Sequence, residues 1–160
     1  MTTKRGNVWL AVSGIVENDK GEWLVVKKTY GGLKGNWSFP AGFVKAGETV
    51  DQAIKREIQE ETGIQTEICG LIGVRSGVIG KEISDNMLIF RLHAKSSEIS
   101  PQEKEVSDVK FKSREELAID QASSLLVVYF AETGFQSSLN LYDTFNPGKH
   151  FGYESYHLFF

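Results

Sequence analysis

The sequence predicts a single α/β (α+β) domain, residues 1–160, built on a mixed β-sheet with helices on its faces. Three observations predict this fold class. Segments rich in β-branched and aromatic residues alternate with capped helical patterns. Their order is strand, strand, helix, several strands and then helices, which is typical of a mixed sheet. No repeat, low-complexity tract or linker divides the chain, and its length is that of one ordinary domain.

The chain opens with two strand patterns. Residues 7–16 and 22–28 are rich in β-branched and aromatic side chains, and the polar turn between them ends in Gly21. This arrangement predicts a hairpin. Three glycines predict a loop over residues 30–35, from which residues 37–40 continue as a short strand.

A helix is expected between Thr49 and Gly63. Thr49 followed by Gln52 fits a capping box, which satisfies amides that a helix leaves unpaired. Gly63 stands where a left-handed residue commonly ends a helix. The face predicted to pack on a sheet carries an apolar stripe, Val50, Ala53, Ile54 and Ile58.

The second half of the chain predicts further strands over residues 66–78, 86–94 and 106–111. Ser113, with Glu116, is expected to open a short helix, and Asp120 a second one that ends near Gly134. The apolar run over residues 125–131 is expected to lie in the core.

Residues 135–160 form an aromatic-rich C-terminal segment for which the sequence predicts no element. Core or interface packing is the favoured role. The interface would be with a second subunit and would make a homodimer. Closure over the pocket and a stacking surface for a base are the alternatives.

Composition excludes some classes of function. The net charge of −3 argues against a broad basic surface, so nucleic acid is an unlikely partner, although a bound divalent cation would locally reverse the field around a phosphorylated substrate. Cys69 is the only cysteine, so it forms no internal disulfide and is expected to be a small buried residue. The N-terminus lacks a signal-peptide pattern and no apolar run is long enough to cross a bilayer, which favours a cytoplasmic protein without membrane partners.

Glutamates Glu57, Glu60 and Glu61 cluster in the helix predicted above. Spacings of three and four residues place them on one face, where like charges repel. Arg56 lies four residues before Glu60 and can pair with it. A solvated helix face is one interpretation, and a cage for a divalent cation, which prefers oxygen ligands, is the other.

Residues 42–64, GFVKAGETVDQAIKREIQEETGI, resemble the Nudix box of the Nudix hydrolase superfamily (MutT-like), G-x5-E-x7-R-E-U-x-E-E-x-G-U with U a bulky aliphatic residue. Every fixed position matches. The preceding segment departs from the usual pattern only in Ala41, which replaces a glycine. The resemblance implies the Nudix fold, a mixed sheet between helices, over about residues 5–134.

The same resemblance implies a reaction and its cofactor. Nudix hydrolases cleave the pyrophosphate of a nucleoside diphosphate linked to another group, by water attack on phosphorus with Mg²⁺ or Mn²⁺. It implies that Glu57, Glu60 and Glu61, with the backbone carbonyl of Ala41, are metal ligands. Arg56 matches the residue that orients a box carboxylate, and Glu48 matches a mainly structural position.

Residues outside the box are assigned on weaker resemblance. Glu105 is the first candidate for the general base and Glu103 the second, with a solvated loop glutamate as the equally weighted alternative. Lys28 and Phe39 resemble positions on the phosphate and nucleoside sides of the substrate, and Arg75 suits phosphate oxygens. A strand-edge charge, a core aromatic residue and a surface arginine are the respective alternatives.

The sequence narrows the expected substrate only to a broad class. Residues 78–84, VIGKEIS, carry neither the proline typical of ADP-ribose enzymes nor the tyrosine typical of dinucleoside polyphosphate enzymes. We therefore expect a nucleoside triphosphate or a nucleotide sugar. The alternatives are a non-catalytic Nudix ligand-sensing module and an RNA 5′-end pyrophosphohydrolase.

Overall fold

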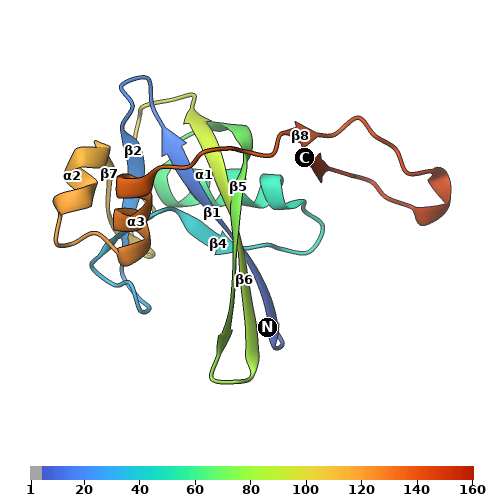
Figure 1. Ribbon diagram of the computed structural model, residues 1–160, viewed down its shortest axis with the longest axis horizontal. Helices are drawn as coiled ribbons and strands as arrows, with labels where there is room; N and C mark the ends of the chain where they lie inside the picture. Colours follow the sequence, from blue (N-terminus) through green and yellow to red (C-terminus); the bar gives the residue numbers. More distant parts are fainter. Residues whose placement is uncertain (1–4) are drawn as a thin grey trace.

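The computed structural model describes residues 5–160, apart from the side chain of Phe151, and a seven-stranded mixed sheet lies at the centre of these residues (Figure 1). Five strands run side by side in the order β3-β2-β1-β6-β5, while β4 pairs with β1 and β7 with β2. β1 and β6 are parallel, and the other pairs are antiparallel. The strands are β1 (Val8–Glu17), β2 (Trp23–Lys28), β3 (Trp37–Ser38), β4 (Ala41–Phe43), β5 (Thr66–Ile79), β6 (Ile83–Ala94) and β7 (Val106–Lys112).

Helices cover both faces of the sheet, as predicted. α1 (Val50–Thr62) packs on one face, while α2 (Arg114–Ile119) and α3 (Leu125–Thr133) pack on the other. The alternation of side chains along β2 builds the two cores: Leu24 and Val26 join the α1 side, whereas Trp23 and Val25 join the α2–α3 side. The prediction of a mixed sheet between helices is confirmed.

Both predicted ends of α1 are present. The side chain of Gln52 accepts the N–H of Thr49 at 2.9 Å, which is the glutamine half of the capping box. Gly63 has a left-handed φ of 77°, and a Cβ there would lie 3.0 Å from the backbone nitrogen of Ser100. Any larger residue would therefore be strained as well as crowded.

The prediction that Asp120 opens the last helix is wrong. Asp120 ends α2, since its N–H donates to the carbonyl of Glu116 at 3.0 Å. Its carboxylate accepts the N–H of Ala122 at 2.8 Å, a local turn that Asp readily makes. α3 begins later, with Ser124 as its N-cap, whose hydroxyl accepts the N–H of Val127 at 3.3 Å.

Two burial predictions are also wrong. The apolar run over residues 125–131 is only partly core, because a helix turns one face to the sheet: Val127 is buried, whereas Leu125 is 89% and Tyr129 61% exposed. Cys69 is exposed. The pairing of β5 with β6 shifts register between Ile68 and Gly70, and Cys69 is the extra residue.

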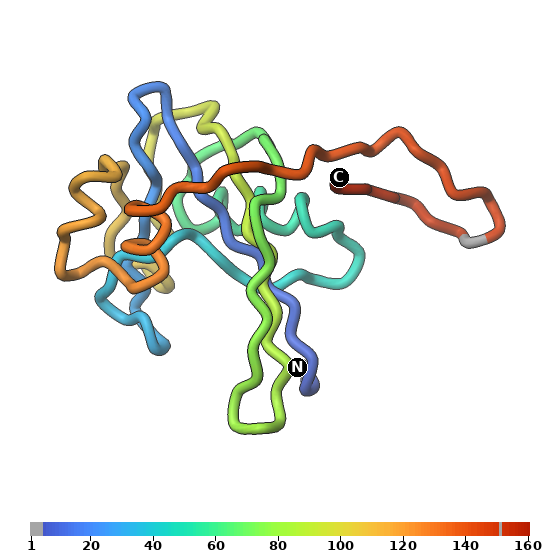
Figure 2. Tube along the Cα trace, in the orientation of Figure 1, coloured from blue at the N-terminus to red at the C-terminus, as the bar shows by residue number. Residues whose placement is uncertain are grey.

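The C-terminal segment leaves the body, extends away from it and returns (Figures 1 and 2). It contains β8 (Leu141–Tyr142), a short 3₁₀ helix η1 (Lys149–Phe151) and β9 (Leu158–Phe159), and β8 pairs with β9. None of the helices in the described residues combines the length and apolarity needed to cross a membrane.

Candidate active site

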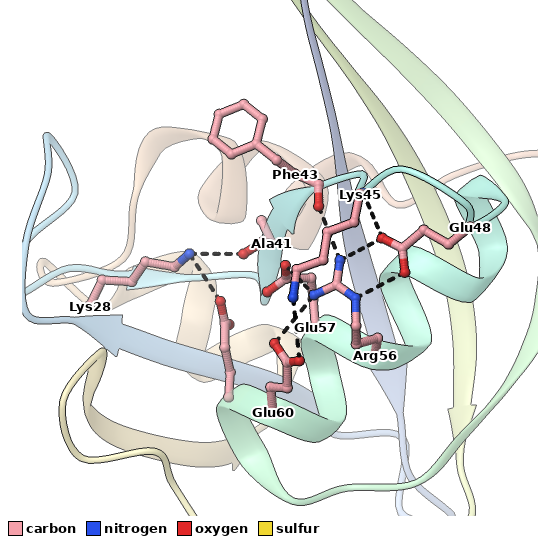
Figure 3. A network of polar contacts seen from close by, with 9 residues as sticks. Lys28, Ala41, Phe43, Lys45, Glu48, Arg56, Glu57 and Glu60 are labelled. Carbon is pink, nitrogen blue, oxygen red and sulfur yellow. Dashed lines mark hydrogen bonds and ion pairs between the residues drawn. The ribbon is translucent and has the colours of Figure 1, made fainter. Parts of the chain in front are cut away.

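Helix α1 packs beside β4 and carries Glu57 and Glu60 (Figure 3), while Glu61 of the same helix reaches Lys28 at the end of β2. Their surroundings differ although they share one helical face. The side chain of Glu61 is only 2% exposed, that of Glu57 is mostly buried, and Glu60 is open to solvent. The three carboxylates therefore differ in how far they are shielded from solvent.

Arg56 is the centre of a polar network (Figure 3). Its guanidinium donates to Glu48 at 2.6 and 3.0 Å, to Glu57 at 2.7 Å and to Glu60 at 3.2 Å. It also donates to the backbone carbonyl of Phe43 at 3.1 Å. The expected pairing of Arg56 with Glu60 is present, and the hydrogen bond from Arg56 lowers the pKa of Glu48. Arg56 thus binds three glutamates of the box, one in the loop before α1 and two on the helix.

Glu57 lies directly over Gly42. A Cβ built on Gly42 would overlap the carboxyl group of Glu57, so a larger residue would force Glu57 to move. Burial raises the pKa of Glu57, against the opposing effect of Arg56. The first glycine of the box therefore makes room for the first glutamate of the cluster.

Glu61 is paired with a lysine from another element. The ammonium of Lys28, at the end of β2, lies 3.0 Å from Glu61 Oε1 and donates to the carbonyl of Ala41 at 2.9 Å. Burial raises the pKa of Glu61 to about 7, although Lys28 acts to lower it. The second carboxylate oxygen of Glu61, Oε2, is buried and has no hydrogen-bond partner.

The oxygen atoms gathered here are of the chemical kind that binds a divalent cation. A cation, the Lys28 ammonium, already lies between the carbonyl of Ala41 and the carboxylate of Glu61. Carboxylate and carbonyl oxygens are the ligands that Mg²⁺ prefers, and Oε2 of Glu61 would gain a partner. As the side chains stand, residues 5–160 contain no group of three or more His, Cys, Asp or Glu placed to hold an ion. Arg56 and Lys28 engage these carboxylates instead.

A largely apolar cavity of about 490 Å³ adjoins this site. Four residues singled out from the sequence line it: Lys28, Phe39, Ala41 and Arg75. Phe39 is also a core residue, packed between Trp23 and Phe130 at ring-centroid distances of 6.0 and 6.3 Å. The guanidinium of Arg75 is held by Asp85 at 2.7 Å.

Comparison with known proteins agrees with this geometry. The family model described as NUDIX domain matches residues 8–130. The chain belongs to the Nudix family. An ADP-ribose pyrophosphatase of Methanocaldococcus jannaschii is 45% identical over 67 residues, which are 42% of this chain and 39% of that protein. An uncharacterized Nudix hydrolase of Listeria monocytogenes is 31% identical over 128 residues, covering 78% of this chain and 75% of the relative.

Solved Nudix structures have the same fold. A Nudix hydrolase from Nitrosomonas europaea superposes with a TM-score of 0.68 at 24% identity, over 81% of this chain and 73% of the other. In this chain the Nudix box runs from β4 through α1 to Ile64, so its fixed spacing joins a strand, a loop and a helix.

Other cavity residues were not found from the sequence. Trp9, Ala11 and Ser13 line the cavity, and their period of two along β1 was the available signal. Phe43 and Met87 line it too, but only tertiary contacts reveal this.

Glu105 lies close to the site through its backbone. Its carbonyl accepts the N–H of Thr29 at 3.0 Å, and the next residue, Val106, pairs with Lys28 across β2 and β7. The cavity wall described above does not include Glu105. Its role as general base stays a prediction.

Proposed function

We propose that this Nudix domain is a hydrolase that cleaves the pyrophosphate linkage of a nucleoside diphosphate derivative with Mg²⁺ or Mn²⁺. One observation carries the proposal: Ala41 and Lys28 belong both to the cluster around Glu61 and to the wall of the apolar cavity. A substrate with its diphosphate at these residues would extend its nucleoside into the cavity. The aromatic rings of Trp9, Phe43 and Tyr30 offer surfaces for a base there.

The chemistry explains the arrangement. A diphosphate is anionic and repels an attacking water, and a bound divalent cation neutralises its oxygens and acidifies the water. In our proposal Glu57, Glu60, Glu61 and the carbonyl of Ala41 hold the ion. Arg56 holds two of these carboxylates in place.

The proposed reaction balances as a hydrolysis. Water attacks one phosphorus, a proton passes from the water to a base, and the bond to the bridging oxygen breaks. The products are a nucleoside monophosphate and the phosphorylated second group, or pyrophosphate from a triphosphate. Glu105 is our candidate for the base.

Nucleoside triphosphates, including oxidised ones, and nucleotide sugars are the first substrates to test. The archaeal relative is named for ADP-ribose, so ADP-ribose joins them. That relative matches this chain over only 39% of its length, so its activity is no more than a guide.

A substrate panel tests the proposal. Purified protein with Mg²⁺ or Mn²⁺ is incubated with each nucleotide and with a 5′-triphosphorylated oligonucleotide, and products are separated by chromatography. We expect turnover of at least one small nucleotide. Turnover of the oligonucleotide alone would assign the RNA alternative, and absence of any product would refute the hydrolase.

Glu61→Gln provides the matched test of the site. We expect kcat to fall on the order of 10²-fold or more, because the charge needed to hold a cation is lost. Glu67→Gln, an exposed glutamate of β5, is the control and should keep full activity. Undiminished turnover by Glu61→Gln would refute the proposed role of the Nudix-box glutamates in catalysis.

A further inference from the structure

We propose that Lys28 is a built-in counter-cation: its ammonium occupies the divalent ion's position in the metal-free protein and is displaced by the ion towards the substrate's diphosphate. The inference rests on the proposed metal site and goes beyond it, since it assigns a second state to a residue of this chain.

Contacts of the ammonium carry the argument. Its nitrogen lies 2.9 Å from the carbonyl oxygen of Ala41 and 3.0 Å from Oε1 of Glu61. These are two of the proposed metal ligands, and they come from β4 and α1, while Lys28 comes from β2. A Mg²⁺ ion bound to both oxygens at about 2.0–2.1 Å would overlap the ammonium. The two cations therefore exclude each other.

Because Glu61 is buried and Lys28 is partly buried, the exchange of one cation for the other should affect stability. The side chain of Glu61 is 2% exposed and that of Lys28 is 19% exposed, so the pair is shielded from solvent. Removing the lysine alone would leave the buried carboxyl group of Glu61 without its partner, which is destabilising. Binding of a divalent ion would restore the missing charge. Loss of Lys28 should therefore destabilise the metal-free protein and favour metal binding.

The displaced ammonium has a place to go. Lys28 lines the adjoining cavity together with Ala41, and a lysine has a flexible stem with a compact charge at its end. From there it would meet the phosphate oxygens of a bound diphosphate. Metal binding would thus release the Lys28 ammonium to contact the substrate. Binding of the metal and binding of the substrate would therefore be coupled.

Lys45 supplies the matched control. Its ammonium lies 4.0 Å from Glu60, another box glutamate, but both side chains are open to solvent, at 64% and 44% exposure. Lys45→Met removes the same charge near the same cluster without touching the Ala41–Glu61 bridge. A general electrostatic effect would appear in both variants, whereas displacement appears only in Lys28→Met.

Binding of Mn²⁺ is measured without nucleotide, by the electron paramagnetic resonance signal of free Mn²⁺. We expect Lys28→Met to bind Mn²⁺ roughly tenfold more tightly than the unmodified protein or more, and Lys45→Met to stay within about twofold. Equal affinity of Lys28→Met and the unmodified protein would overturn the proposal while leaving the metal site intact. Absence of Mn²⁺ binding by the unmodified protein would overturn the proposal and the proposed function together.

Thermal unfolding gives an independent readout. In EDTA, Lys28→Met should melt below the unmodified protein, and saturating Mn²⁺ should remove the difference. A deficit that persists in Mn²⁺ would overturn the proposal, because it would show that Lys28 is needed in both states. If Lys28→Met does not fold in EDTA, Lys28→Gln is measured instead, since it removes the charge and keeps a hydrogen-bond donor at this position.

Discussion

Gly42 and Glu57 show how single residues set the geometry of the Nudix box. The glutamate carboxyl packs where a side chain of residue 42 would begin, and Arg56 holds one of its oxygens at 2.7 Å. Moving Glu57 aside would disturb this ion pair, whose side chains are only 20% and 12% exposed. The glycine is needed for space, since its φ is not positive.

Gly42→Ala tests this packing. We expect a loss of about 1–3 kcal/mol in the free energy of unfolding, because the added methyl group must displace Glu57 from Arg56. Urea denaturation measures the loss. Gly73→Ala is the control, as a Cβ at that position meets no atom within 4 Å. Equal stabilities of the two variants would contradict the close contact.

Residue-scale prediction succeeded where partners are close in sequence. The pairing of Arg56 with Glu60 follows from helical spacing alone. The pairing of Glu61 with Lys28 could not be predicted in this way. Lys28 belongs to a separate strand, and only the folded sheet brings the two side chains within 3.0 Å. The family resemblance placed Lys28 near phosphate, but its contact with two expected metal ligands needed coordinates.

At the scale of elements, segments rich in β-branched and aromatic residues predicted the central strands correctly, and the apolar stripe and end signals predicted α1 with both its ends. The end signal at Asp120 misled. Asp is favoured both at helix starts and in tight turns. Asp120 adopts the turn, because its carboxylate also pairs with Lys112 of β7 at 2.7 Å. Local sequence does not reveal that lysine, which reaches it from the sheet.

Asp120 should contribute to stability in a pH-dependent way. The hydrogen bond from Lys112, helped by the N–H of Ala122, lowers the pKa of Asp120 below its ordinary value of 3.8. A lowered pKa means that the stabilisation is present above pH 3.8 and is lost as the pH falls through the folded-state pKa.

Asp120→Asn should therefore be less stable than the unmodified protein at pH 7, by roughly 0.5–1 kcal/mol, and the gap should close in acid. Urea titrations at pH 7 and below pH 3 measure it. Asp108→Asn, whose pair with Lys110 is long at 3.9 Å and exposed, is the control and should show a smaller gap. A gap that widens in acid would contradict the assignment.

At the scale of the whole molecule, the C-terminal segment is the part that sequence could not predict. Its aromatic residues follow neither a helical nor a strand period, and contacts that hold it to the body join residues distant in sequence. Leu139 pairs with Leu71 of β5 at 2.8 and 2.9 Å, and His157 lies 2.8 Å from Asp51 at the start of α1. The segment is thus anchored at both ends on the body, while its middle projects (Figure 2).

Phe159 is the apolar anchor of the returning end. Its ring meets Phe90 of β6 edge-on at 5.6 Å and packs against the core cluster that α1 covers. Phe160, the neighbouring residue, is 67% exposed and stacks on Tyr142 of the same segment at 4.3 Å. Substituting each of the two adjacent phenylalanines therefore distinguishes the effect of packing on the body from the loss of an aromatic ring as such.

Phe159→Ala should cost about 1–3 kcal/mol of unfolding free energy, since it removes a partly buried ring from the core that supports the Nudix helix. Phe160→Ala should cost less than about 0.5 kcal/mol. Urea denaturation followed by tryptophan fluorescence measures both variants. If the segment were merely appended to the Nudix domain, the two substitutions would have the same small effect. A large difference would instead make residues 158–159 part of the core beneath α1, and so part of what holds the glutamates of the site in place.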